Sequence, residues 1–165
     1  MKILWVMLLL AACGGNAGDI VVPAPAVLRT DLYYGYYGGG QSVLEALPHT
    51  NIIFESGLFG PEAQLNVIEA AKLPTILDID AYVYYGALGT NRKIRPDIEN
   101  ALRVRLNELR DRNLLQYIIA LYPIDEPNNT IVDAATIVKA NGIVRRIASE
   151  YLPNVKLAAI YSRGH

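Results

Sequence analysis

Two adjacent carboxylic acids, Asp125 and Glu126, stand directly before a proline in the sequence. Neighbouring residues in extended backbone point to opposite faces, so only one of the two acids leads directly into a site. Pro127 disfavours helical geometry for Glu126 and so fixes the direction of that side chain. The adjacent charge disfavours ionising both acids and holds one of them protonated, as a general acid requires. The spacing therefore predicts proton-transfer chemistry at this pair.

Further acids and tyrosines fall where predicted strands end. They are Glu55, Asp78, Asp80, Tyr36, Tyr82, Tyr122 and Tyr161. In α/β folds with parallel strands, sites form at the carboxyl ends of the strands. Aromatic rings stack on the apolar faces of sugars, and carboxylates hydrogen-bond hydroxyls or handle protons. We expect these residues to line a carbohydrate site together with Asp125 and Glu126.

The elements that must position these residues alternate along the chain. Apolar, β-prone runs predict strands at 32–37, 51–55, 75–80, 117–122 and 155–161. Helical spacing predicts helices at 42–47, 61–73, 97–112 and 131–151. Nearly continuous apolar strands alternating with helices indicate a parallel sheet covered by helices, the α/β class.

Two α/β architectures fit this order: a partial eight-fold β/α barrel of about five units, or a complete five-stranded doubly wound sheet. The 165 residues are too few for a closed barrel, which needs about 250. Asp78 and Asp80 are expected on one face of the third strand, where an open sheet would bury them under helices. The chain also ends shortly after the fifth strand. We therefore predict a partial barrel over 31–165, truncated at its carboxyl end.

The run Tyr122-Pro123-Ile124-Asp125-Glu126-Pro127, closing the fourth strand, resembles a signature of the retaining glycoside hydrolases of the large barrel clan. In that clan an Asn-Glu-Pro or Asp-Glu-Pro motif stands there, and its glutamate is the acid/base. The resemblance implies that Glu126 is the acid/base and that Asp125 takes the place of the neighbouring substrate-orienting residue.

The resemblance also implies a missing group, because the clan's nucleophile ends the seventh strand. We expect the chain to be inactive alone and to be a glycosidase only as part of a longer chain. An inverting pair such as Asp80 with Glu126, about 6.5–9.5 Å apart, is an alternative. A second hypothesis is a non-enzymatic envelope lipoprotein that binds glycan or protein, and a third is a complete small α/β domain.

The amino terminus predicts an export signal. Residues 1–12 carry Lys2 and then an apolar run too short to span a bilayer. Leu10-Ala11-Ala12-Cys13 resembles the lipobox of bacterial lipoproteins, which implies removal of 1–12, lipidation of Cys13 and anchoring in the cell envelope. Gly14 after the cysteine implies the outer membrane. Residues 13–30 form a predicted flexible tether.

The amino-acid composition limits the classes of partner and cofactor that the chain is expected to bind. The chain is 52% hydrophobic with a net charge of −1, which excludes disorder and argues against nucleic acid. A single cysteine excludes a disulfide framework, and we expect neither a metal site nor a cofactor. The lipid anchor is the expected contact with the membrane. Open sheet edges on the first and fifth strands predict self-association.

Structural roles remain open for the same residues. Asp78 and Asp80 could pair with Arg92, Lys93 or Arg95, and the tyrosines could be core packing. The segment 125–127 could lead into a helix capped by Asn128, Asn129 or Thr130. On the helix at 97–112, a solvated face is expected for Arg103, Arg105, Arg110 and Arg112.

Overall fold

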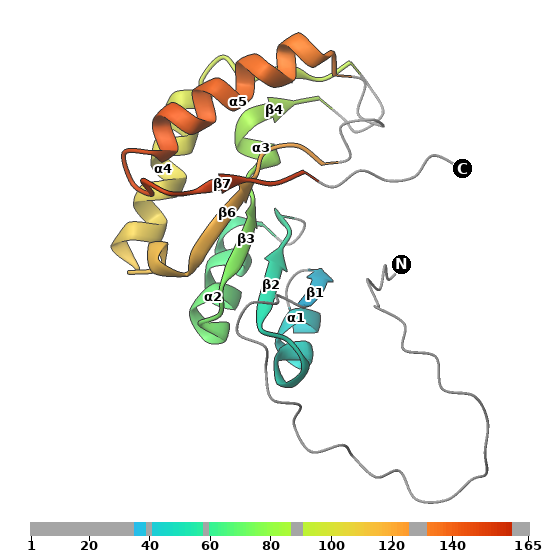
Figure 1. The fold of residues 1–165 in the computed structure, drawn as a ribbon, viewed down its shortest axis with the longest axis vertical. Coiled ribbons are helices and arrows are strands. Elements are labelled where there is room, and N and C mark those ends of the chain that lie inside the picture. The colour runs from blue at the N-terminus through green and yellow to red at the C-terminus, as the bar shows by residue number, and fades with distance from the viewer. Residues whose placement is uncertain (1–34, 39–40, 58–59, 87–90, 126–131, 160–165) are drawn as a thin grey trace, which may run out of the picture.

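A computed structural model describes residues 35–38, 41–57, 60–86, 91–125 and 132–159 and shows an α/β fold (Figure 1). The strands of its main sheet, in spatial order, are β1 (Gly35–Gly38), β2 (Ile52–Glu55), β3 (Thr75–Asp78), β6 (Ile118–Tyr122) and β7 (Lys156–Leu157). The larger helices are α1 (Gln41–Ala46), α2 (Pro61–Ala71), α4 (Ile98–Asp111) and α5 (Ala134–Ala148). Short 3-10 turns cover Leu47–His49 and Leu115–Tyr117. The α/β class predicted from the sequence is confirmed.

The spatial order of the strands follows their order in the sequence. Every neighbouring pair in the main sheet is parallel. A doubly wound sheet reverses its strand order at a switch point, and the described strands contain no reversal. The described strands therefore have a sequential order without a switch point.

Along β3 the residues of the two faces of the sheet differ in burial. On β3, Thr75 and Leu77 are fully buried, whereas the alternating residues Ile76 and Asp78 are half-buried. Leu77 belongs to a core cluster in which α2, α4 and α5 take part through Leu65, Ile68, Leu102, Leu106, Leu109, Val144 and Ile147. On the other face, the Phe54 and Tyr122 rings pack edge to face with centroids 4.9 Å apart. The described helices that meet this core therefore cover the Leu77 face of the sheet.

The third strand is shorter than the sequence predicts. Ile79, with φ −123° and ψ 13°, leaves the strand conformation, and Asp80 begins the short helix α3 (Asp80–Val83). The prediction that Asp78 and Asp80 alternate along one strand face is therefore wrong. A short antiparallel hairpin, β4 (Tyr84–Tyr85) with β5 (Lys93–Ile94), follows and was not predicted.

Helix α5 begins later than predicted. Asp133 precedes it in extended conformation, and its Oδ1 accepts a hydrogen bond from the Thr136 N–H at 2.8 Å. A cap of this kind satisfies one of the free N–H groups of the first turn. The capping residue is thus Asp133 and not Asn128, Asn129 or Thr130, which lie outside the described residues.

Helix α4 is also less solvated than predicted. Arg103 on α4 makes an ion pair with Glu150, and Arg112, the residue after the helix, makes one with Glu62. The Arg146–Glu99 pair adds a further link where α4 and α5 lie side by side (Figure 1). Arg105, however, is fully buried, so its placement on a solvated face is wrong. In the described part of the chain, no helix is long and apolar enough to cross a membrane.

Candidate functional site

The carboxyl ends of the central strands lie level with one another. Gly38 lies beside Glu55, and Asp78 lies beside Tyr122. Residues that follow these strands therefore meet at one edge of the sheet. A cleft of about 580 Å³ opens there and is lined by Gly57, Pro61, Gln64, Asp78, Asp80, Ala81, Tyr82, Arg92, Arg95, Asp97, Ala101, Val104 and Asp125. Of the predicted site residues, Asp78, Asp80, Tyr82 and Asp125 come together in this cleft.

Asp80 is almost fully buried, and its carboxylate accepts hydrogen bonds from two segments of the chain. Arg92, from the segment before β5, donates to Asp80 Oδ2 at 2.8 Å and also to Oδ1. The Asp125 N–H donates to Asp80 Oδ2 at 2.8 Å. Of the three basic residues expected as possible partners of Asp80, it is Arg92 that pairs with it. Asp80 therefore joins the end of β3 to the hairpin segment and to the loop after β6.

Asp125 is held from two sides. Besides its N–H bond to Asp80, its Oδ1 accepts a hydrogen bond from the Tyr122 hydroxyl at 2.9 Å. Tyr122 itself is fully buried, so in this structure its ring packs on Phe54 and is no exposed sugar platform. The Tyr122 hydroxyl orients the Asp125 carboxylate, a contact that the sequence analysis did not predict.

Asp78 ends β3 and is held by backbone groups. Its Oδ1 accepts from the Asp80 N–H at 2.9 Å, and its Oδ2 accepts from the Gly57 N–H at 3.3 Å. Burial raises the pKa of Asp78 to about 6, although both N–H groups act to lower it. The nearby charges of Asp80 and Asp125 raise the pKa further. Asp78 can therefore hold or release a proton near neutral pH.

Gln64 connects the ends of two strands to the helix layer. Its amide donates to the backbone carbonyls of Glu55 at 3.1 Å and Asp78 at 3.0 Å. Its Oε1 accepts from the buried Arg105 guanidinium, which also donates to the Pro61 carbonyl at 3.2 Å. Nothing in the sequence analysis singled out Gln64 or the buried role of Arg105. Through these bonds, Gln64 and Arg105 hold the carboxyl ends of β2 and β3 in place relative to each other at the edge of the cleft.

Two tyrosines after β3 lie beside the arginines. The Arg105 guanidinium stands 5.7 Å from the Tyr82 ring centroid, and the Arg92 guanidinium stands 5.4 Å from that of Tyr84. Burial raises the pKa of Tyr84 to about 12 and also raises that of Tyr82. Both hydroxyls therefore stay protonated at neutral pH. Tyr82, which is half-buried, lines the cleft, whereas Tyr84 belongs to the core.

Glu55 does not line the cleft. It lies beside Leu77 in the register of β2 and β3, and both side chains are fully buried. Residues paired in this way point to the same face, so the Glu55 side chain lies on the helix-covered face of the sheet. The expectation that Glu55 binds substrate at the site is not met by this geometry.

Four predicted residues cannot be placed with side chains. Glu126, Tyr161 and Cys13 lie outside the described residues, and for Tyr36 the structure describes only the backbone within β1. Among the residues that the structure does describe, no group of three His, Cys, Asp or Glu side chains could hold a metal ion.

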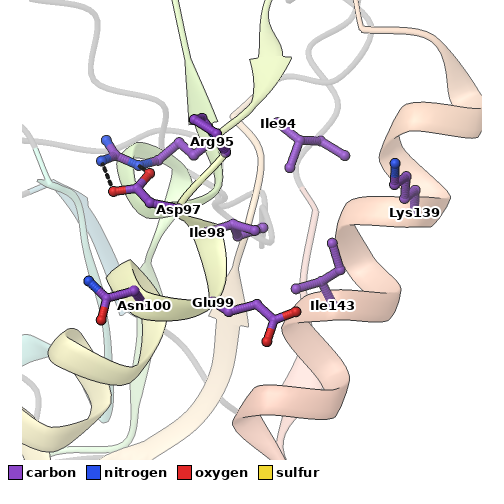
Figure 2. A pocket seen from close by; sticks show the side chains of 9 residues that line it. Ile94, Arg95, Asp97, Ile98, Glu99, Asn100, Lys139 and Ile143 are labelled. Atoms are coloured by element: carbon purple, nitrogen blue, oxygen red, sulfur yellow. Dashed lines mark hydrogen bonds and ion pairs between the residues drawn. The ribbon is translucent and has the colours of Figure 1, made fainter.

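A second groove of about 560 Å³ lies between the start of α4 and the middle of α5 (Figure 2). Its floor and walls include Ile98 from α4 together with Ile143 and Lys139 from α5. The ion pair between Arg95 and Asp97, with 2.9 Å between nitrogen and oxygen, lines this groove and also the cleft at the carboxyl edge of the sheet. Both residues of this pair are substantially exposed, so the pair lies on the rim that the groove and the cleft share.

Comparisons of the chain with protein-family models, with curated proteins and with solved structures gave no match.

Proposed function

We propose that this chain is the amino-terminal part of a β/α barrel protein that acts on carbohydrate. One observation carries the proposal: Asp78, Asp80 and Asp125, from the ends of β3 and β6, converge on a single cleft at the carboxyl edge of a parallel sheet. Clefts at this edge are where β/α barrels bind their substrates. The sequential strand order and the helices gathered on the Leu77 face are further support for a barrel.

Within this proposal Glu126 is the acid/base, as the Asp-Glu-Pro motif implies. It directly follows Asp125, whose backbone N–H is bonded to Asp80 and whose carboxylate is bonded to Tyr122. The polar contacts of Asp125 thus give the residue before Glu126 a defined place at the edge of the cleft. A fixed backbone is what a general acid needs to meet the leaving oxygen of a glycoside.

The test uses the protein encoded by the full reading frame and a panel of nitrophenyl glycosides. We expect Glu126→Gln to abolish nitrophenol release, because the amide cannot donate the proton. Asp111→Asn is the matched control, since Asp111 is an exposed residue on α4 outside the cleft. Unchanged turnover by Glu126→Gln would remove Glu126 from the mechanism.

A non-enzymatic glycan-binding protein is the second candidate, and the partners of Asp80 favour it. A carboxylate bonded to Arg92 and to a backbone N–H is poorly suited to act as nucleophile or base. Retained glycan binding by Glu126→Gln, together with no turnover by the unaltered protein, would select this second function.

The proposal includes anchoring by a lipid on Cys13 at the bacterial envelope, in the outer membrane. The apolar run before the cysteine and the Leu-Ala-Ala-Cys motif support it. We expect Cys13→Ser to move the protein from the membrane fraction to the soluble fraction. Continued sedimentation of Cys13→Ser with membranes would contradict the lipid anchor.

A further inference from the structure

The aspartates at the edge of the cleft do not have equal freedom to meet a ligand. Asp80 bonds to both terminal nitrogens of Arg92 and to the Asp125 N–H. Asp125 is bonded to the Tyr122 hydroxyl. Asp78 is bonded only to backbone N–H groups by its carboxylate and makes no ion pair with any described residue.

Within Asp78 the two oxygens also differ. Oδ1 takes the short bond from the Asp80 N–H, at 2.9 Å, whereas Oδ2 takes the longer bond from the Gly57 N–H, at 3.3 Å. A Cβ placed on Gly57 would stand 4.0 Å from Oδ2, so the missing side chain leaves the approach to this atom open. Gly57 is itself exposed and lines the same cleft. Oδ2 is therefore the carboxylate atom that faces an incoming ligand.

We propose that Asp78, through Oδ2, is the carboxyl group of the cleft that forms a direct hydrogen bond with the ligand, the ligand being a neutral polyhydroxylated molecule. When protonated, the Oδ2–H donates to a ligand oxygen. When ionised, Oδ2 accepts from a ligand hydroxyl, and the carboxylate keeps its bonds to the Gly57 and Asp80 N–H groups. The inference takes the class of ligand from the proposed function. It adds the atom that meets the ligand and the dependence of that hydrogen bond on the protonation of Asp78.

The charges around Asp78 fit this role. Asp80 on α3 and Asp125 after β6 oppose its ionisation, and Arg92, a cation that lines the same cleft, is bonded to Asp80. Tyr82 on α3 is kept neutral by burial, and Arg95 at the rim is paired with Asp97. Gln64 on α2 is uncharged and donates to the Asp78 carbonyl at 3.0 Å, and the Arg105 guanidinium is bonded to Gln64. Burial holds the pKa of Asp78 at about 6, so both protonation forms are present near neutral pH.

The experiment follows the side-chain carboxyl ¹³C signal of Asp78 in the full chain while glycerol is added as a small diol probe. We expect a saturable shift with half-saturation on the order of 0.1 M, a weak affinity suited to so small a ligand. We also expect the titration midpoint of Asp78 to move when glycerol is bound. The Asp111 signal reports the bulk solvent effect, which is linear in glycerol.

Gly57→Leu is the decisive variant, because it fills the approach to Oδ2 and removes no polar group. We expect it to lose the saturable shift while Asp78 still titrates near pH 6. A linear response equal to that of Asp111, an unmoved midpoint, or an unchanged response in Gly57→Leu would each overturn the inference. Glycerol has no glycosidic bond, so failure of the glycosidase test leaves this result unaffected. Glycosidase turnover together with an Asp78 signal that shows no saturable shift would overturn only the present inference.

Discussion

At the carboxyl edge of the sheet, each aspartate holds the backbone of the next. Asp78 accepts from the Asp80 N–H, and Asp80 accepts from the Asp125 N–H. The same functional group therefore has different roles at different positions. Asp80 positions the chain, because burial of its charge is matched by Arg92, whereas the burial of Asp78 has no cation to offset it.

The pKa of Asp78 makes stability depend on pH in a particular direction. Its pKa of about 6 in the folded protein lies above the ordinary value of 3.8, so the folded protein binds the proton more tightly than the unfolded chain does. Between about pH 4 and pH 6, ionisation of Asp78 therefore lowers the free energy of unfolding as pH rises, by a total on the order of 2–3 kcal/mol. Asp78→Asn should lack this loss, and urea unfolding across the range measures the difference. A difference between variant and parent that stays constant from pH 4 to 7 would contradict the raised pKa.

The buried Asp80–Arg92 pair predicts a strong coupling between two substitutions. Asp80→Ala or Arg92→Ala alone leaves a buried charge without its partner and should cost about 3–5 kcal/mol of unfolding free energy. The double variant should cost clearly less than the sum of the two, because neither charge remains. Chemical denaturation of the three variants gives the coupling. Simple additivity would show that the two side chains do not interact.

At the scale of elements, the sequence predicted the regular units well and the connection after β3 poorly. The apolar runs located β2 and β6 to within one residue, and the spacing of Ile98, Leu102, Leu106 and Leu109 located α4. These patterns work because burial of one helix face or strand face leaves a period in the chain. The hairpin at Tyr84–Tyr85 and Lys93–Ile94 leaves almost none, because each strand has only two residues.

The buried polar residues show why the site was only partly predictable. Gln64 lies four residues before Ile68, and Arg105 lies three after Leu102, so both fall on the apolar stripe of their helices. The signal was present, but a polar side chain on such a stripe is ordinarily assigned to solvent. What keeps each buried is a partner far away in the chain, 41 residues apart for Arg105 and Gln64. Single-sequence periodicity carries no information on such pairs.

Two substitutions in and next to helix α5 should change the free energy of unfolding in opposite directions. Gly142 lies inside the helix, is exposed, and a Cβ there would meet nothing within 4 Å. Gly142→Ala should therefore raise the free energy of unfolding by about 0.5–1 kcal/mol. Asp133→Ala should lower it by about 1 kcal/mol, because the Thr136 N–H loses its cap. Thermal unfolding measures both, and a destabilising Gly142→Ala would show that α5 is not a regular helix there.

For the whole molecule, the sidedness of the sheet distinguishes the possible architectures. In a barrel the helices lie outside and the inner face meets only other strands, whereas a doubly wound sheet has helices on both faces. Leu77 is fully buried beneath the helices, and its neighbour Ile76 is half-buried on the opposite face. The two residues are neighbours on one strand, so they compare the two faces at β3, although Phe54 and Tyr122 on the Ile76 face are buried.

We expect Leu77→Ala to cost about 2–5 kcal/mol of unfolding free energy, because it leaves a cavity in a closed core. Ile76→Ala in this 165-residue chain should cost much less, because part of the Ile76 side chain is already in water and the surrounding face can relax. Urea denaturation of the two variants at one pH measures the contrast. Equal costs would mean that both faces are covered to the same extent, as in a doubly wound sheet. If the proposed barrel is closed by further strands in a longer chain, the cost of Ile76→Ala should rise toward that of Leu77→Ala, since those strands would bury the face that carries Ile76.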